Sequence, residues 1–161
     1  MTTIVSDTSP INYLVLIGAV DVLPKLFSEV LIPPAVHFEL QSPRTPSAVF
    51  RWTAVLPSWA RVQEPSTIDR SIALGAGETE AISLAMELGI SALLIDERKG
   101  RLAAEQRGLV PVGTLNVLDS ADRRGFLDFQ ECVARLRQTS FYVDDALVET
   151  LLREARARKT P

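Results

Sequence analysis

Short apolar runs alternate with segments of helical periodicity from residue 2 to about residue 123. The runs predict buried strands at 2–6, 30–32, 92–95 and 110–112, with an edge strand at 61–64 just before Pro65. Helical patterns fill the intervals, at about 9–17, 21–27, 34–40, 47–55, 77–88, 97–107 and 114–123. This alternation predicts an α/β protein of three layers, α/β/α, with a central, mostly parallel sheet.

Local signals place the ends of these elements. Ser9-Pro10 and Thr45-Pro46 each predict a helix cap followed by proline at the first helical position. Gly89 and Gly108 predict helix stops, and Thr114 a further cap. Two amphipathic helices after Gly125, at about 128–138 and 144–159, predict a C-terminal helical hairpin.

The composition fits one domain spanning 1–161, with a core at about 1–123 and C-terminal helices at about 126–159. The chain has 161 residues, is 47% hydrophobic and carries a net charge of −3. This acidic balance disfavours a scaffold that binds nucleic acid through phosphates alone, while leaving room for contacts through metal ions and a few arginines. Cys132 is the only cysteine, so no internal disulfide is possible. We expect a soluble, cytoplasmic protein with no membrane association, because the apolar run 11–20 is too short to span a bilayer.

Four acidic residues occupy positions where a strand ends or a helix begins or runs inward: Asp7, Glu39, Glu78 and Asp96. Each has a plain structural alternative, since the aspartates could cap helices and the glutamates could lie on solvated helix faces. Together they predict convergence at the carboxyl edge of the sheet, where open α/β sheets place ligands. Converging carboxylates repel one another unless a hard cation joins them, so the pattern favours divalent-metal phosphate chemistry.

The chain resembles the PIN-domain family, in particular VapC-like toxin ribonucleases and short PIN-like nucleic acid-binding proteins. The segments that carry the resemblance run in order through residues 5–14, 32–40, 77–82, 94–101 and 112–115. Each segment is weak alone, and the ordered set is fairly specific.

The resemblance implies a metal-dependent endoribonuclease using Mg²⁺ or Mn²⁺, in which activated water attacks an RNA phosphodiester. The family's acidic positions carry over to Asp7, Glu39, Glu78 and Asp96, which would be both catalytic and metal-binding. Asp7 and Asp96 would bind the metal directly, and Glu39 and Glu78 directly or through water. Glu80 rivals Glu78, but residues two apart on a helix point in different directions, which favours Glu78.

Several neighbouring residues have open roles near the predicted site. Thr8 and Ser9 would contribute hydroxyls there, although Ser9 could equally cap its helix. Thr114 could contact phosphate, yet a cap is favoured. Arg98 stands where many family members have another acidic residue and could contact RNA phosphate, while Asn116 stands where the short group usually has glycine. His37, the only histidine, would point away from Glu39 on a helix and is expected at the surface or core edge.

The resemblance further implies an RNA substrate, a protein antitoxin and a homodimer, as for the toxin of a toxin–antitoxin pair. One alternative is a non-catalytic PIN-like module that binds RNA or protein. A less favoured one is a Mg-dependent phosphatase of the haloacid-dehalogenase type, which needs a second aspartate where this chain has Ser9.

Overall fold

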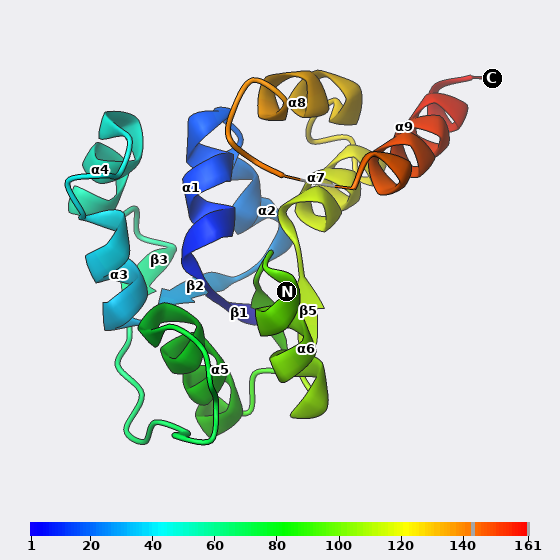
Figure 1. The fold of residues 1–161 in the computed structure, drawn as a ribbon. Coiled ribbons are helices and arrows are strands. Elements are labelled where there is room, and N and C mark those ends of the chain that lie inside the picture. Colours follow the sequence, from blue (N-terminus) through cyan, green and yellow to red (C-terminus); the bar gives the residue numbers. More distant parts are fainter. Residues whose placement is uncertain (143, 161) are drawn as a thin grey trace.

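A computed structural model describes residues 1–142 and 144–160. Its strands form one five-stranded parallel sheet in the order β3-β2-β1-β4-β5 (Figure 1). The strands are β1 (Thr3–Ser6), β2 (Glu29–Ile32), β3 (Ala60–Val62), β4 (Ala92–Leu94) and β5 (Val110–Val112). The prediction of an α/β protein with a parallel sheet is confirmed, and β3 is an edge strand as expected.

Helices follow each strand along the chain. They are α1 (Thr8–Leu16), α2 (Leu23–Leu26) after the short 3₁₀ turn η1 (Val20–Val22), α3 (Pro34–Leu40), α4 (Ser47–Ala54), α5 (Ala76–Leu88), α6 (Arg98–Gln106), α7 (Thr114–Arg123), α8 (Phe129–Leu136) and α9 (Asp145–Lys159). Their bounds lie within about two residues of the predicted ones, the usual uncertainty at element ends.

The strand residues divide between two hydrophobic cores because successive side chains of a strand point to opposite faces. Ile4 and Leu94 pack into a core shared with α1, α3, α7, α8 and α9. Val5 and Leu93 pack into the other core, against α5 and Ala104 of α6. Figure 1 shows α1 and α2 on one side of the sheet and α5 and α6 on the other. The three predicted layers are therefore present.

The predicted caps are wrong at three helix starts. The N-cap positions of α1, α4 and α7 are held by Asp7, Pro46 and Gly113, each one or more residues away from the expected Ser9, Thr45 and Thr114. Serine and threonine before a helix have other uses in a folded chain: the Thr45 hydroxyl donates to the Glu39 carbonyl at 2.9 Å. The predicted stops are confirmed, because Gly89 and Gly108 adopt left-handed φ angles of 67° and 78° after α5 and α6.

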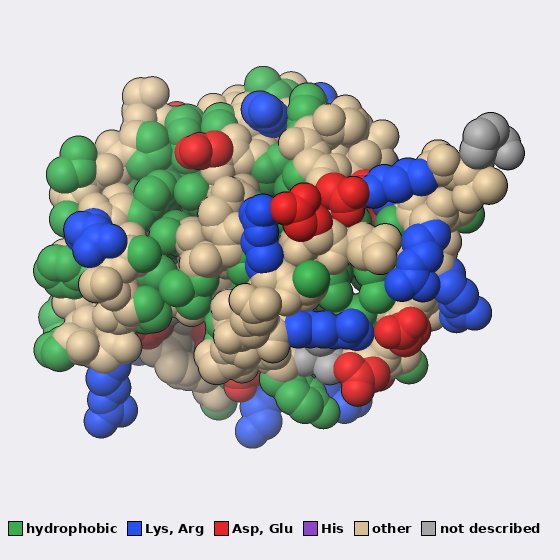
Figure 2. Space-filling model, turned by 90° about the horizontal axis from the view of Figure 1, so that it is seen from above, with side chains coloured by type: hydrophobic (Ala, Val, Ile, Leu, Met, Phe, Trp, Pro, Cys, Tyr) green, Lys and Arg blue, Asp and Glu red, His purple; other side chains and the backbone are tan. Residues whose placement is uncertain are grey.

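The two C-terminal helices complete the first core. Phe129 of α8 and Leu152 of α9 are buried in it, as is Cys132. Arg158 pairs with Asp119 and Asp122 at 3.1 and 2.9 Å, which fastens the end of α9 to α7. Figure 2 shows charged side chains of both signs mixed on the side of the molecule where α9 lies, and hydrophobic side chains gathered on the α3–α4 side.

Within the described residues no single helix has the length and apolar character needed to cross a membrane; α1 together with the η1–α2 segment meets that measure only as a pair bent by 114°.

Candidate active site

The ends of β1 and β4 bring two of the predicted aspartates together. β1 is paired with β2 on one side and β4 on the other, so the chain changes direction across the sheet at the β1–β4 pair. Ligands of open α/β sheets bind at this kind of switch point. Asp7 directly follows β1, Asp96 lies two residues beyond β4, and the Asp7 backbone N–H donates to the Leu94 carbonyl at 2.8 Å.

A large pocket opens at this edge of the sheet. All four predicted carboxylates line it: Asp7, Glu39, Glu78 and Asp96. Three acidic residues that were not predicted for the site line it too: Glu97, Asp144 and Asp145. Arg98 and Arg101 also line it, as do residues from the connection between α8 and α9. Its volume of about 1300 Å³ exceeds the roughly 300–1,000 Å³ of typical small-molecule sites. The pocket therefore suits a large ligand.

Asp7 is the most buried of these carboxylates, with 5% of its surface exposed. It occupies the N-cap position of α1, but its side chain makes no capping hydrogen bond there. The cap alternative thus fails for Asp7, and its carboxylate is left for the pocket. Its pKa is raised to about 7, chiefly by burial and also by the charges of Glu39, Asp96 and Glu97, while the Thr8 backbone N–H acts in the opposite direction.

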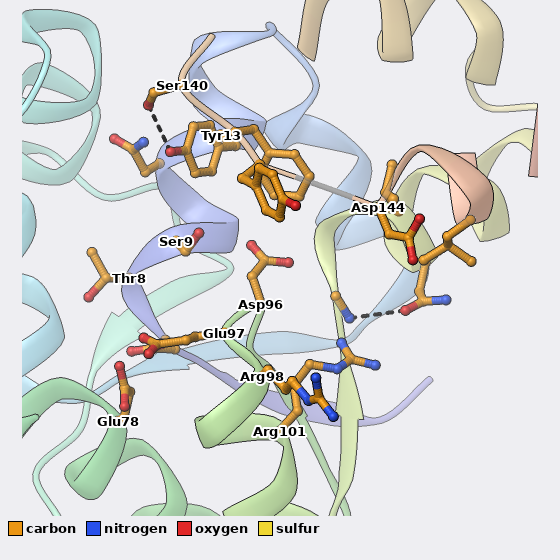
Figure 3. A pocket seen from close by; sticks show the side chains of 18 of the residues that line it. Thr8, Ser9, Tyr13, Glu78, Asp96, Glu97, Arg98, Arg101, Ser140 and Asp144 are labelled. Carbon is orange, nitrogen blue, oxygen red and sulfur yellow. Dashed lines mark hydrogen bonds between the residues drawn. The ribbon is translucent and has the colours of Figure 1, made fainter. Parts of the chain in front are cut away.

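Glu78 and Glu80 separate clearly in the structure. Glu78, in the first turn of α5, lines the pocket. Glu80 instead accepts a hydrogen bond from the Ala35 backbone N–H at 3.1 Å, at the start of α3. The pKa of Glu78 is raised to about 7 by burial, by the charge of Asp7 and by a hydrogen bond with Glu97, whose carboxyl lies beside it in Figure 3. The preference for Glu78 at this site agrees with this geometry.

Glu39 is held at the pocket by its neighbours on α1 and α5. The Thr8 hydroxyl donates to Glu39 Oε2. A Cβ atom at Gly77 would lie 2.8 Å from Glu39 Oε1, so the absence of a side chain at Gly77 leaves the space that this carboxylate occupies. Glu39 is exposed to solvent, but its carboxylate is fixed at the pocket by the Thr8 hydroxyl.

Asp96 is fixed by the start of α7. Its Oδ1 accepts from the Thr114 backbone N–H and its Oδ2 from the Thr114 hydroxyl, both at 2.7 Å. The cap alternative for Asp96 named α6, yet α6 begins at Arg98 with Glu97 at its N-cap position. Asp96 instead accepts, through Oδ1, one of the backbone N–H groups at the start of α7 that have no partner within the helix.

The remaining predicted residues divide between the pocket and the scaffold. Thr8, Ser9, Arg98 and Asn116 line the pocket. Asn116 also accepts from the Gly113 backbone N–H at 3.2 Å, so its side chain stabilises the start of α7. His37 Nε2 donates to the Thr53 carbonyl at 3.0 Å, toward α4 and away from the carboxylates.

The sequence analysis missed Glu97, Arg101 and the residues of the α8–α9 connection. Glu97 was expected only as the first residue of the helix at 97–107, and in the structure it holds the N-cap position of α6 while also lining the pocket. The connection comes from a distant part of the sequence and carries no motif, so no local signal placed it at the pocket.

The donor set at the pocket suits a hard cation, since it consists of carboxylate oxygens without histidine or cysteine. In the described part of the chain, however, the side chains as they stand place no three His, Cys, Asp or Glu groups in an arrangement that could hold a metal ion. Burial first, and then the neighbouring carboxylates, raise the pKa values of Asp7 and Glu78 to about 7.

Comparison with known proteins agrees with this architecture. Residues 3–157 match the family model described as DUF3368, a PIN domain, so the chain belongs to the PIN-domain family. PIN domains are generally nucleases, and the chain is thus a nuclease-type module. No curated protein and no solved structure matches it.

Proposed function

We propose that this protein is a metal-dependent endoribonuclease that hydrolyses RNA phosphodiester bonds. The observation that carries the proposal is the convergence of Asp7, Glu39, Glu78 and Asp96, from four separate segments, on one pocket at the switch point of the sheet. Membership of a family of nuclease-type domains supports it.

Asp7 and Asp96 would hold Mg²⁺ or Mn²⁺, with Glu39 and Glu78 as direct or water-mediated ligands. The fit rests on the oxygen donor set and on the raised pKa values of Asp7 and Glu78, which come from burial and from the neighbouring carboxylates. When bound, the cation would supply positive charge to the phosphodiester oxygens and lower the pKa of water.

The chain's own residues would orient these groups. Thr114 holds both oxygens of Asp96, and Thr8 holds one oxygen of Glu39. Arg98 and Arg101 lie beside the carboxylates in Figure 3, where either guanidinium could contact an RNA phosphate. Binding at the arginines would bring a phosphate toward an otherwise repulsive acidic site.

A toxin of a toxin–antitoxin pair is the cellular role we propose, with cytoplasmic location, a protein antitoxin that covers the pocket and a homodimeric state. The wide pocket supports this role because a protein segment could enter it. Co-expression with a small protein encoded beside it should suppress nuclease activity, and light scattering should give the mass of a dimer.

A non-catalytic PIN-like module is the second candidate. The observation in its favour is that the described side chains, as they stand, form no group of three metal-binding residues. Such a module would bind RNA or protein without hydrolysis.

Cleavage assays separate the two functions. The purified protein would be incubated with single-stranded and structured RNAs in Mn²⁺, Mg²⁺ or EDTA, beside Asp96→Asn and the matched control Asp21→Asn, an exposed aspartate outside the pocket. Cleavage that needs the metal, vanishes in Asp96→Asn and persists in Asp21→Asn is expected. RNA binding without cleavage would favour the module, and absence of Mn²⁺ binding would overturn the metal-dependent enzyme.

A further inference from the structure

One aromatic side chain lines the acidic pocket while remaining open to solvent. Tyr142, in the connection between α8 and α9, borders the pocket with 93% of its surface exposed. Its ring therefore contributes little to the hydrophobic cores. An exposed ring beside a proposed RNA site is suited to contact a ligand.

The chain is anchored on both sides of Tyr142. The hydroxyls of Ser140 and Tyr13 form a hydrogen bond of 2.9 Å, and the Phe141 ring packs edge-on against Tyr13 with centroids 4.9 Å apart. On the other side, Asp144 accepts from the Ala146 backbone N–H at 2.8 Å and caps α9. These contacts fix the chain at Ser140 and Phe141 before Tyr142 and at Asp144 after it.

The acidic character of the pocket favours a ligand contact that does not depend on charge. Seven carboxylates line the pocket against Arg98 and Arg101, two of them, Asp144 and Asp145, close to Tyr142 in the sequence, and the whole chain carries a net charge of −3. Attraction for phosphates alone cannot supply the affinity, because that term requires an excess of positive charge. Stacking of a base on an aromatic ring is independent of charge and contributes about 1–3 kcal/mol per base.

We propose that Tyr142 is a stacking platform for an unpaired nucleobase, so that the pocket selects single-stranded RNA. This inference rests on the proposed ribonuclease function. In Figure 3, Ser140 and Tyr13 lie on the opposite side of Asp96 from Arg98 and Arg101. A strand crossing the pocket would place a base on the Tyr142 side and a phosphate on the arginine side. A paired base inside a duplex has no free face to offer, which gives the selectivity.

The test measures binding without requiring cleavage. A fluorescein-labelled, 12-nucleotide single-stranded RNA of mixed sequence is titrated in Ca²⁺ with the full chain, Tyr142→Ala, Tyr142→Phe and Phe50→Ala, an exposed aromatic outside the pocket. Tyr142→Ala should raise the Kd about 5- to 150-fold. Tyr142→Phe should bind within about twofold of the unchanged chain, since stacking needs only the ring. Phe50→Ala should do the same, because Phe50 lies outside the pocket.

Two further readouts report stacking itself. The loss in Tyr142→Ala should stay constant as salt rises, whereas an arginine contribution would shrink. RNA carrying 2-aminopurine at single positions should lose fluorescence on binding the unchanged chain and Tyr142→Phe, and keep it with Tyr142→Ala. Equal affinity of Tyr142→Ala and the unchanged chain, or failure of the unchanged chain to bind this RNA, would overturn the inference.

Failure of the inference is separable from failure of the proposed function. Metal-dependent cleavage that is insensitive to Tyr142→Ala, with binding equally insensitive, would leave the nuclease intact and remove the platform. Binding that depends on Tyr142 without any cleavage would keep the platform and remove the nuclease.

Discussion

Thr114 donates a hydrogen bond to each carboxylate oxygen of Asp96, from its backbone N–H to Oδ1 and from its hydroxyl to Oδ2, both at 2.7 Å. This pair joins the end of β4 to the first turn of α7. A second lone pair on each oxygen remains for a ligand. The orientation of Asp96 therefore depends on a residue far along the chain.

Replacing Thr114 by valine should weaken the site by freeing one oxygen of Asp96. Loss of a group that orients a metal ligand typically costs about 10–100-fold in metal affinity or activity. We expect this loss in Mn²⁺ titration calorimetry and in RNA cleavage. Thr114→Ser keeps the hydroxyl and should stay near the unchanged chain; full activity in Thr114→Val with a loss in Thr114→Ser would show that the methyl packing, not the hydrogen bond, matters.

Glu78 and Glu80 should give opposite results when substituted. Glu78→Gln should abolish cleavage and Mn²⁺ binding while leaving the fold intact. Glu80→Ala should retain Mn²⁺ binding but lower the free energy of unfolding by about 1 kcal/mol, because the Ala35 N–H loses its acceptor near the start of α3.

Thermal unfolding and metal titration distinguish these outcomes. For a chain of this size, 1 kcal/mol corresponds to a fall in Tm of about 2–4 °C. Glu80→Gln retains a carbonyl acceptor and serves as the control. Loss of Mn²⁺ binding in the Glu80 variants would show that Glu80, and not Glu78, is the third acidic ligand.

The sequence predicts the layers of this fold well because strands buried on both faces leave a continuous apolar signal, as at residues 92–95. It also places Asp7 and Asp96 at the site, since strand ends meet at one edge of a parallel sheet. Helix caps are predicted poorly: Ser9 and Thr114 fit a cap by residue type, but Ser9 lines the pocket and the buried Thr114 hydroxyl donates to Asp96. Contacts over long sequence distances, such as Tyr13 with Ser140, leave no local pattern.

Gly77→Ala should damage the site without damaging the helix. The new methyl would lie 2.8 Å from Glu39 Oε1 and displace that carboxylate from its hydrogen bond with Thr8. Alanine is otherwise better than glycine in a helix by about 1 kcal/mol. We expect cleavage to fall at least about tenfold with an unchanged or higher Tm. Gly75→Ala, where a Cβ meets nothing within 4 Å, is the matched control and should keep full activity.

Asp7 should make the metal-free protein less stable as the pH rises. Its pKa is about 7 in the folded chain against an ordinary value of 3.8, so between these values the folded state binds more protons than the unfolded state. The free energy of unfolding then falls with rising pH across this window, by at most about 4 kcal/mol at about 1.4 kcal/mol per pKa unit. Below pH about 4 the contribution is constant, because Asp7 is protonated in both states.

Asp7→Asn removes this titration and should therefore stabilise the metal-free chain at pH 8, by several degrees in Tm, with an advantage that shrinks toward pH 5. Comparing the two proteins at each pH in EDTA cancels the opposite, acid-side contributions of Asp69 and Asp128, whose pKa values are lowered by hydrogen bonds to Ser71 and Lys159. Addition of Mn²⁺ should reverse the order at pH 8, since binding stabilises only the chain that keeps the Asp7 ligand. A variant less stable than the unchanged chain at every pH in EDTA would show that Asp7 contributes to the fold as an ionised, well-paired group, and would remove charge crowding from the account of this site.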